Sequence, residues 1–230
     1  MNRIARHTVS GSKCTMVPME TSAMIQRSAT QKGIKGILTR VASLMSKAQY
    51  EEARKALEEG ITLAPLDKRI WEQMVACSIA LKRPKDALSA LDRILQIDPR
   101  SDRAWSDKAY LHLLLNEKHE GIEALKKSLK IEPRNQRKWL LLASAYMSLE
   151  NWRAAIDALE RAILLDPNSS AAWYNYAVCF FFEGDYDSAL SAAEMAFTLD
   201  PALEDVAESW IRIIKSGVLD VEDDDIIAAE

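Results

Sequence analysis

Residues Ser170–Leu203 read SAAWYNYAVCFFFEGDYDSALSAAEMAFTLDPAL and contain the pattern that decides the fold. Their proline is the last of five that follow one another at intervals of 34 residues: Pro65, Pro99, Pro133, Pro167 and Pro201. Counted in units that begin at residues 34, 68, 102, 136 and 170, the fourth place is bulky (Ile37, Trp71, Trp105, Trp139, Trp173) and the twentieth is small (Ala53, Ala87, Gly121, Ala155, Ala189). A fixed period of this length is typical of a solenoid, in which each repeat packs only on its neighbours.

Two helices are expected in each unit. From Gly33 onward the apolar residues recur with the helical period, and the second half of each unit has apolar residues four apart, such as Leu91 and Leu95. Proline cannot continue a helix, so each of the five prolines marks the end of a unit. In the link Asp98–Ser101 we expect Ser101 to cap the following helix.

The repeated places resemble those of the tetratricopeptide repeat (TPR) family. The matches are the bulky fourth place, a small eighth place, an aromatic eleventh place, the small twentieth place and the final proline; the eighth and eleventh places include Ala109, Ala143, Ala177, Tyr146 and Phe180. The resemblance implies an all-α fold, a right-handed α-solenoid of five 34-residue helix-turn-helix repeats over residues 34–201. Residues 202–217 have one more amphipathic period, with Trp210 and Ile214, and are predicted to form a C-terminal capping helix.

The two ends differ in charge from the repeats. Residues 1–33 are basic, hydroxylated and without a helical period, so we predict a mostly disordered extension. A transit peptide and a misassigned start at Met16 or Met19 are the alternatives. Residues 218–230 are predicted to be an acidic, disordered tail, which either solubilises the protein or competes with acidic partners for its arginines.

Composition argues against several classes of protein. A net charge of −4 is opposite in sign to the usual footprint of a nucleic-acid-binding protein, and no apolar run is long enough for a membrane span. Cys77 and Cys179 are expected to be buried packing residues, and His112 a core or half-buried one. Metal-ligand spacings, glycine-rich phosphate loops and nucleophile motifs are absent from the sequence. We therefore predict no enzymatic activity, no cofactor and no metal, and a cytoplasmic location, with organelle targeting through residues 1–30 as the alternative.

The family resemblance implies a concave groove lined by the first helix of each repeat, at about its second, fifth, sixth, ninth, twelfth and thirteenth places. The second place is arginine in three consecutive units: Arg69, Arg103 and Arg137. Arginine binds carboxylates through its planar fork, so a ladder of three would suit an extended acidic chain. The alternative is that each arginine stacks on its neighbouring tryptophan or pairs with a nearby aspartate, such as Asp67.

A second, apolar zone follows from the same places. Its residues are Tyr110, Leu113, Leu114, Leu140, Leu141, Met147, Tyr174, Val178, Phe181 and Phe182. Asn175 lies among them and would offer hydrogen bonds to the backbone of an extended ligand. An exposed apolar surface of this size indicates a binding site or self-association, and tighter burial within the coil is the alternative.

These observations favour a non-catalytic scaffold or adaptor that binds a peptide segment of a partner protein in the concave groove. The predicted contact residues are Arg69, Arg103, Arg137, Tyr110, Leu140, Tyr174, Asn175, Phe181 and Phe182. Leu38, Ala42 and Gln73 stand where the carboxylate clamp of chaperone-binding family members has polar or charged residues, which argues against that role. The alternatives are homo-oligomeric assembly and an accessory assembly factor in an organelle.

Overall fold

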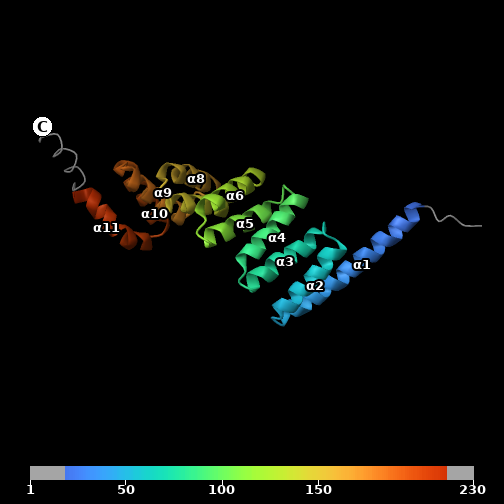
Figure 1. Cartoon of the computed structure of the whole chain (residues 1–230). Coiled ribbons are helices and arrows are strands. Elements are labelled where there is room, and N and C mark those ends of the chain that lie inside the picture. Colours follow the sequence, from blue (N-terminus) through green and yellow to red (C-terminus); the bar gives the residue numbers. More distant parts are fainter. Residues whose placement is uncertain (1–18, 217–230) are drawn as a thin grey trace, which may run out of the picture. The chain divides into compact units, whose positions relative to one another are not determined.

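The computed structural model describes residues 19–216, which form eleven helices and no strand (Figure 1). None of the helices in this range is both long and apolar enough to cross a membrane. In chain order they are α1 (Met19–Ser46), α2 (Tyr50–Leu63), α3 (Lys68–Ala80), α4 (Pro84–Ile97), α5 (Asp102–Leu114), α6 (Lys118–Ile131), α7 (Gln136–Met147), α8 (Trp152–Leu165), α9 (Ser170–Glu183), α10 (Tyr186–Leu199) and α11 (Ala202–Ser216). The predicted all-α fold is confirmed.

The first helix begins earlier than the sequence pattern indicated. We expected residues 1–33 to be mostly disordered, whereas α1 begins at Met19. The segment Met19–Lys32 contains methionine, alanine, glutamine, glutamate and lysine, all of which favour helix without needing a buried face. Residues 1–18 and 217–230, and with them the predicted acidic tail (residues 218–230), lie outside the described residues.

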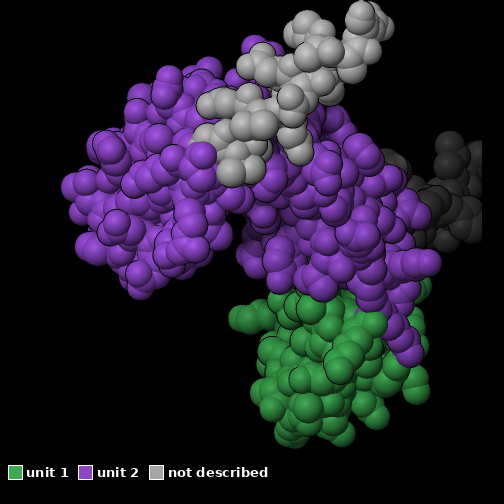
Figure 2. Space-filling model, turned by 90° about the vertical axis from the view of Figure 1, so that its left-hand side faces the viewer, with its two compact units in different colours: residues 1–82 green, residues 83–230 purple. Residues whose placement is uncertain are grey.

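The chain divides into two compact units, residues 1–82 and 83–230 (Figure 2). In the first unit, α1, α2 and α3 all contact one another. In the second unit, each helix from α4 to α11 contacts the next one along the chain. This sequential packing is what a repeat architecture requires, because each element buries its apolar face on its neighbours.

Small residues let the helices approach closely. The twentieth-place residues are buried in both units, and so are Cys77 and Cys179, as predicted. Leucines at the predicted stripe places, including Leu57, Leu91, Leu125 and Leu159, are almost fully buried. The apolar periodicity of the sequence therefore identified the core correctly.

The two most regular features of the sequence, tryptophan and proline, are joined by hydrogen bonds. In four of the 34-residue repeats, the indole Nε1–H of the fourth-place tryptophan donates to the carbonyl of the proline six residues earlier. The N···O distances are 2.8 Å for Trp71–Pro65, 3.0 Å for Trp105–Pro99, 2.8 Å for Trp139–Pro133 and 2.8 Å for Trp173–Pro167. Each bond ties the start of a first helix to the end of the preceding unit.

The final helix covers the last pair. Ala207 and Trp210 of α11 are buried against Ala177, Ala189, Ala192 and Ala193. The Trp210 ring lies 5.5 Å from the ring of Phe181, measured between centroids. Thus α11 shields apolar surface that α9 and α10 would otherwise leave open.

Candidate functional site

The predicted groove residues of the second unit lie on α5, α7 and α9. These three helices begin in the same way: the side chains of Ser101, Asn135 and Ser169 accept hydrogen bonds from the backbone N–H groups of Ala104, Lys138 and Ala172. The prediction that Ser101 is an N-cap is confirmed. Equivalent caps start the three helices at equivalent places of the repeat, so residues at the same place have the same position on each helix.

Several apolar side chains of this set are open to solvent. Tyr110, Leu114 and Phe182 are 58%, 66% and 55% exposed. Leu140, Tyr174, Asn175 and Phe181 are partly buried. We call these seven residues, together with Arg103 and Arg137, the inner-helix face.

The aromatic residues of this face are positioned by ring contacts. Phe182 stacks on Trp152 of α8 with centroids 4.4 Å apart and an angle of 12° between the rings, so one face of Phe182 remains open. Phe181 lies against Phe182, Tyr186 and Trp210. Phe181 therefore packs largely within the protein, and Phe182 is the more available of the two.

Glycine at residue 121 positions another apolar side chain. A Cβ atom there would lie 2.7 Å from both Cγ and Cδ2 of Leu113, too close for two carbon atoms. Leu113 thus lies over α6 in space that alanine, found at this place in the other repeats, would occupy. The glycine weakens α6 by about 1 kcal/mol relative to alanine, but it lets Leu113 turn away from solvent.

The three predicted arginines differ in what surrounds them. Arg69, in the first unit, donates from Nε to Asp67 Oδ1 at 3.0 Å and from Nη2 to Asp67 Oδ2 at 2.7 Å. These hydrogen bonds hold the pKa of Asp67 below its ordinary value. The local-pairing alternative therefore holds for Arg69, whose fork is occupied by a carboxylate of its own chain.

Arg103 and Arg137, in the second unit, remain open. Arg103 is 85% exposed at its side chain, and among residues 19–216 its ion pair is with Asp107, at a long 3.8 Å. Arg137 is exposed, and no ion pair of its guanidinium is found among residues 19–216. The difference has a simple origin: the residue two places before Arg69 is the capping Asp67, whereas the caps before Arg103 and Arg137 are the neutral Ser101 and Asn135.

Asp107 is a member of this surface that the sequence analysis missed. It occupies the sixth place of its unit, the place that identified Asn175 in the fifth, so the same rule would have found it. Burial raises the pKa of Asp107, and the nearby charge of Arg103 opposes that rise. The carboxylate gives the arginine pair a polar neighbour that would repel an acidic ligand at this one point.

A polar network centred on the buried Ser128 connects α5, α6 and α7. Ser128 of α6 is fully buried, donates to Asp102 Oδ1 at 2.6 Å and lies 2.8 Å from the hydroxyl of Ser106. Lys138 of α7 donates to the same Asp102 oxygen at 2.5 Å and to Glu132 at 2.8 Å. Burial alone would raise the pKa of Asp102, but hydrogen bonds from Lys138 and Ser128 outweigh it and leave that pKa below its ordinary value. The network joins α5, α6 and α7 at the end where Arg103 and Arg137 lie.

His112 and Cys179 are of residue types that enzymes often use, and here both take part in packing. His112 is partly buried, as expected, and its Nδ1 lies 2.6 Å from Glu117 Oε2. Burial, together with the charge of Glu183, raises the pKa of Cys179 to about 12, so its thiol is protonated at neutral pH and is a poor nucleophile. Within residues 19–216, no three His, Cys, Asp or Glu side chains come together in a way that could hold a metal ion.

Family models match most of the repeat region. A tetratricopeptide repeat model matches residues 44–118, a second matches residues 102–135, and the TPR domain of cytochrome c-type biogenesis protein H matches residues 120–200. The chain belongs to the tetratricopeptide repeat proteins. No curated protein sequence matches it.

Solved structures of this fold are similar to the chain at low sequence identity. A crystal structure of MamA superposes with a TM-score of 0.66 at 17% identity, over 76% of this chain and 96% of that one. MamA from Desulfovibrio magneticus RS-1 has a TM-score of 0.62 at 20% identity, over 74% and 96% of the two chains. YrrB, described as a TPR protein with an unusual peptide-binding site, has a TM-score of 0.62 at 13% identity, over 75% and 93%. These likenesses establish the TPR solenoid fold.

Proposed function

We propose that this protein is a non-catalytic interaction scaffold that binds a peptide segment of a partner protein on the inner-helix face. The observation that carries the proposal is the pairing of open cations with open apolar side chains in one unit. Among residues 19–216, Arg137 has no ion pair and Arg103 has only the long 3.8 Å contact with Asp107, and Tyr110, Leu114 and Phe182 are more than half exposed. Exposed apolar residues beside unpaired charge are typical of an interface.

The ligand chemistry follows from these side chains. The guanidinium groups favour carboxylates, which they bind in a bidentate way. Tyr110, Leu114 and Phe182 would each contribute about 1.5–3 kcal/mol if a ligand buried them fully. The ligand that fits is therefore a segment with acidic residues near α5 and α7 and a bulky apolar residue near Phe182. YrrB, a peptide-binding member of the same fold, supports a peptide as the class of ligand.

A peptide-display experiment tests the proposal and does not require an identified partner. The full-length protein is used to select from a random peptide library, and we expect peptides that combine Asp or Glu with bulky apolar residues. Affinities of the best peptide are then measured for Arg103→Glu and Arg137→Glu, each expected to bind about tenfold more weakly. Tyr110→Ala and Phe182→Ala should also weaken binding.

Two controls make the result specific. Arg69→Glu should change the affinity less than twofold, because Asp67 already occupies the Arg69 guanidinium. The double variant Lys85→Glu/Arg153→Glu alters charge on α4 and α8 and should bind as the wild type does. Equal binding by the Arg103 and Arg137 variants and the wild type would contradict the proposal.

Self-association is the second candidate, and one observation favours it. Val206 and Ile213 of α11 are 61% and 40% exposed. On another face of α11, which does not include Val206 or Ile213, a pocket of about 490 Å³ shared with α10 is lined by Leu190, Phe197 and Ile211 among others. A mass that increases with concentration in light scattering, and that Val206→Glu abolishes, would support assembly through this end of the second unit.

The place of action is part of the same proposal. We propose a cytoplasmic scaffold. Mass spectrometry of the protein isolated from its native cells tests this, because loss of residues 1–30 would indicate import into an organelle instead.

A further inference from the structure

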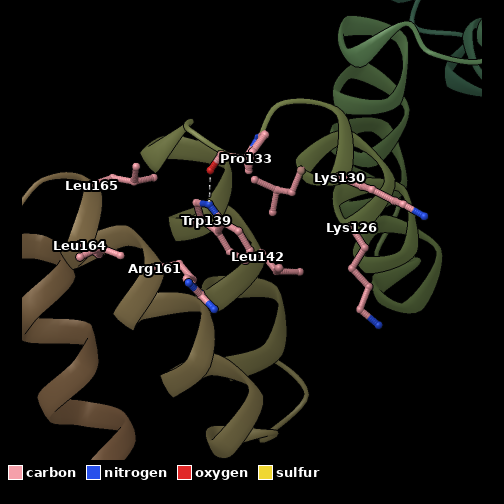
Figure 3. A pocket seen from close by; sticks show the side chains of 9 residues that line it. Lys126, Lys130, Pro133, Trp139, Leu142, Arg161, Leu164 and Leu165 are labelled. Carbon is pink, nitrogen blue, oxygen red and sulfur yellow. Dashed lines mark hydrogen bonds between the residues drawn. The ribbon is translucent and has the colours of Figure 1, made fainter.

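A pocket of about 480 Å³ lies in the second unit, between α6, α7 and α8. Figure 3 shows Lys126 and Lys130 extending from α6 on one side and Leu164, Leu165 and Arg161 on the other, with Trp139 between them. None of its lining residues belongs to the inner-helix face. It is therefore a separate candidate site.

The walls of the pocket are apolar and partly open. Leu164 and Leu165 are 72% and 38% exposed, while Leu129 and Leu142 are buried. The Trp139 ring is held in place by its hydrogen bond to the Pro133 carbonyl, drawn as a dashed line in Figure 3. Leu164 breaks the repeat pattern, because the equivalent residues of the other units are polar: Thr62, Gln96, Lys130 and Thr198.

The rim of the pocket is cationic. Lys126 occupies a place that is acidic in every other unit, where Glu58, Asp92, Glu160 and Glu194 stand. Lys126 pairs with Glu123 at 2.9 Å, whereas the described part of the chain provides no ion pair for Lys130 or Arg161. No carboxylate is among the residues that line the pocket. The exposed leucine and the inverted charge thus occur at one site.

The chain contains a segment with the complementary composition. Residues 217–230, GVLDVEDDDIIAAE, have six carboxylates and no cation, and include the apolar pairs Val218–Leu219 and Ile226–Ile227. The segment follows α11 in the same unit, three helices along the chain from α8. Helices pack 8–10 Å apart, so three steps across the helices cover about 30 Å, and the 15 residues of α11 add about 22 Å along them. The direct path is therefore about 37 Å, and the residues from Ser216 to Ile227 can extend about 36–40 Å.

We propose that the acidic segment 217–230 binds in this pocket of its own chain, with Ile226 and Ile227 between Trp139 and Leu164 and its carboxylates beside Lys130 and Arg161. The pocket offers both parts of the recognition. It holds an apolar wall for the isoleucines and unpaired cations for the aspartates. The inner-helix face also combines arginines with apolar side chains, but Asp107 stands beside Arg103 there, whereas no carboxylate lines the pocket.

Disulfide cross-linking in the full-length protein tests the proposal. With Cys14 replaced by serine and the buried Cys77 and Cys179 retained, one variant carries Leu164→Cys and Ile226→Cys. The matched control carries Leu114→Cys and Ile226→Cys, because Leu114 is similarly exposed but belongs to the inner-helix face. We expect the first pair to form an intramolecular disulfide at least ten times faster than the second under mild oxidation.

Charge variants of the Leu164→Cys/Ile226→Cys protein test whether electrostatic attraction, and not random collision, brings the two cysteines together. Lys130→Glu/Arg161→Glu should slow the Leu164–Ile226 cross-link at least tenfold, and the milder Lys130→Gln/Arg161→Gln should slow it less. Lys85→Glu/Arg153→Glu, with the same change in charge elsewhere, should leave the rate unchanged. Equal rates for the two cysteine pairs, faster reaction at Leu114, or a cross-link found only between two chains would each overturn the proposal.

Discussion

At the scale of single residues, the tryptophan-proline pairs explain why the sequence period is so regular. The fourth-place indole and the final proline are conspicuous in the sequence because the folded chain joins them by a hydrogen bond in four successive units. Proline contributes a carbonyl at a fixed backbone geometry, and tryptophan is the apolar side chain that can also donate a hydrogen bond. The 34-residue period of tryptophan and proline therefore reflects one contact that recurs from repeat to repeat.

Replacing Trp139 by phenylalanine tests that contact. The variant keeps an aromatic ring but loses the hydrogen bond to Pro133, so we expect the free energy of unfolding to fall by about 1 kcal/mol in urea denaturation. Trp152→Phe is the matched control, because the indole of Trp152 makes a ring contact with Phe182 and its substitution should preserve that stacking. If both substitutions have the same effect, the hydrogen bond is not the cause.

The Asp102 network predicts a dependence of stability on pH. Because the pKa of Asp102 lies below its ordinary value of 3.8, its stabilising contribution is present above that pH and is lost as the pH falls through the lower folded pKa. The variant Asp102→Asn should therefore lose less stability than the wild type between pH 5 and about pH 2, although it is less stable than the wild type at pH 6. Urea denaturation across this range checks the prediction, with Asp157→Asn, an exposed position on α8, as a control expected to follow the wild type.

Residue-scale features were predictable where the backbone determines them. The cap at Ser101 and the burial of Cys77 follow from their places in the repeat, and both predictions are confirmed. The state of Arg69 depends on a side chain two residues earlier, which the ladder hypothesis treated as an alternative. Reading the caps together with the arginines would have separated Arg69 from Arg103 and Arg137.

At the scale of helices and their links, one backbone feature repeats without a matching sequence signal. The turn between the two helices of each 34-residue repeat contains a residue with positive φ: Ala48 at 57°, Lys82 at 56°, Asn116 at 61°, Glu150 at 56° and Gly184 at 82°. Only the last is glycine, the residue that adopts this conformation without strain. The same conformation occurs at five different residue types, so the preference of the residue does not determine the turn.

Glycine should therefore stabilise the protein at two of these turns. Lys82→Gly and Glu150→Gly remove the steric cost of the left-handed conformation, about 1–2 kcal/mol, and add chain entropy to the unfolded state, about 0.4–1 kcal/mol. We expect each to raise the free energy of unfolding by about 0.5–1 kcal/mol. Asn116→Gly should be nearly neutral because asparagine tolerates this conformation, and Gly184→Ala should be destabilising. A loss of stability in either glycine variant would contradict this account of the turns.

Among the helices, the start of α1 was the least predictable. Helix ends marked by proline and a polar cap could be placed from the sequence, as α5 and α9 show. The beginning of α1 has neither signal, and its first residues have helix-forming side chains without an apolar stripe. Periodicity reports burial, so it could not reveal a helical segment that precedes the repeats.

At the scale of the whole molecule, the repeat explains the fold, and departures from the repeat indicate function. Leu164 and Lys126 break the pattern at one pocket, and neither is apparent from the features that the repeats share. The open arginines of α5 and α7 differ from Arg69 through their caps alone. A comparison of equivalent places, unit against unit, is therefore the sequence signal that finds both candidate sites.

The most direct test of the central claim is to locate a bound peptide on the protein. A selected acidic peptide carrying a photoreactive side chain is cross-linked to the full-length chain, and the modified residues are identified by mass spectrometry. We predict cross-links on α5, α7 and α9 around Tyr110, Leu114 and Phe182, and their loss in the Arg103→Glu/Arg137→Glu variant. Cross-links confined to α6 and α8, or to the first unit, would contradict the assignment of the inner-helix face as the binding surface.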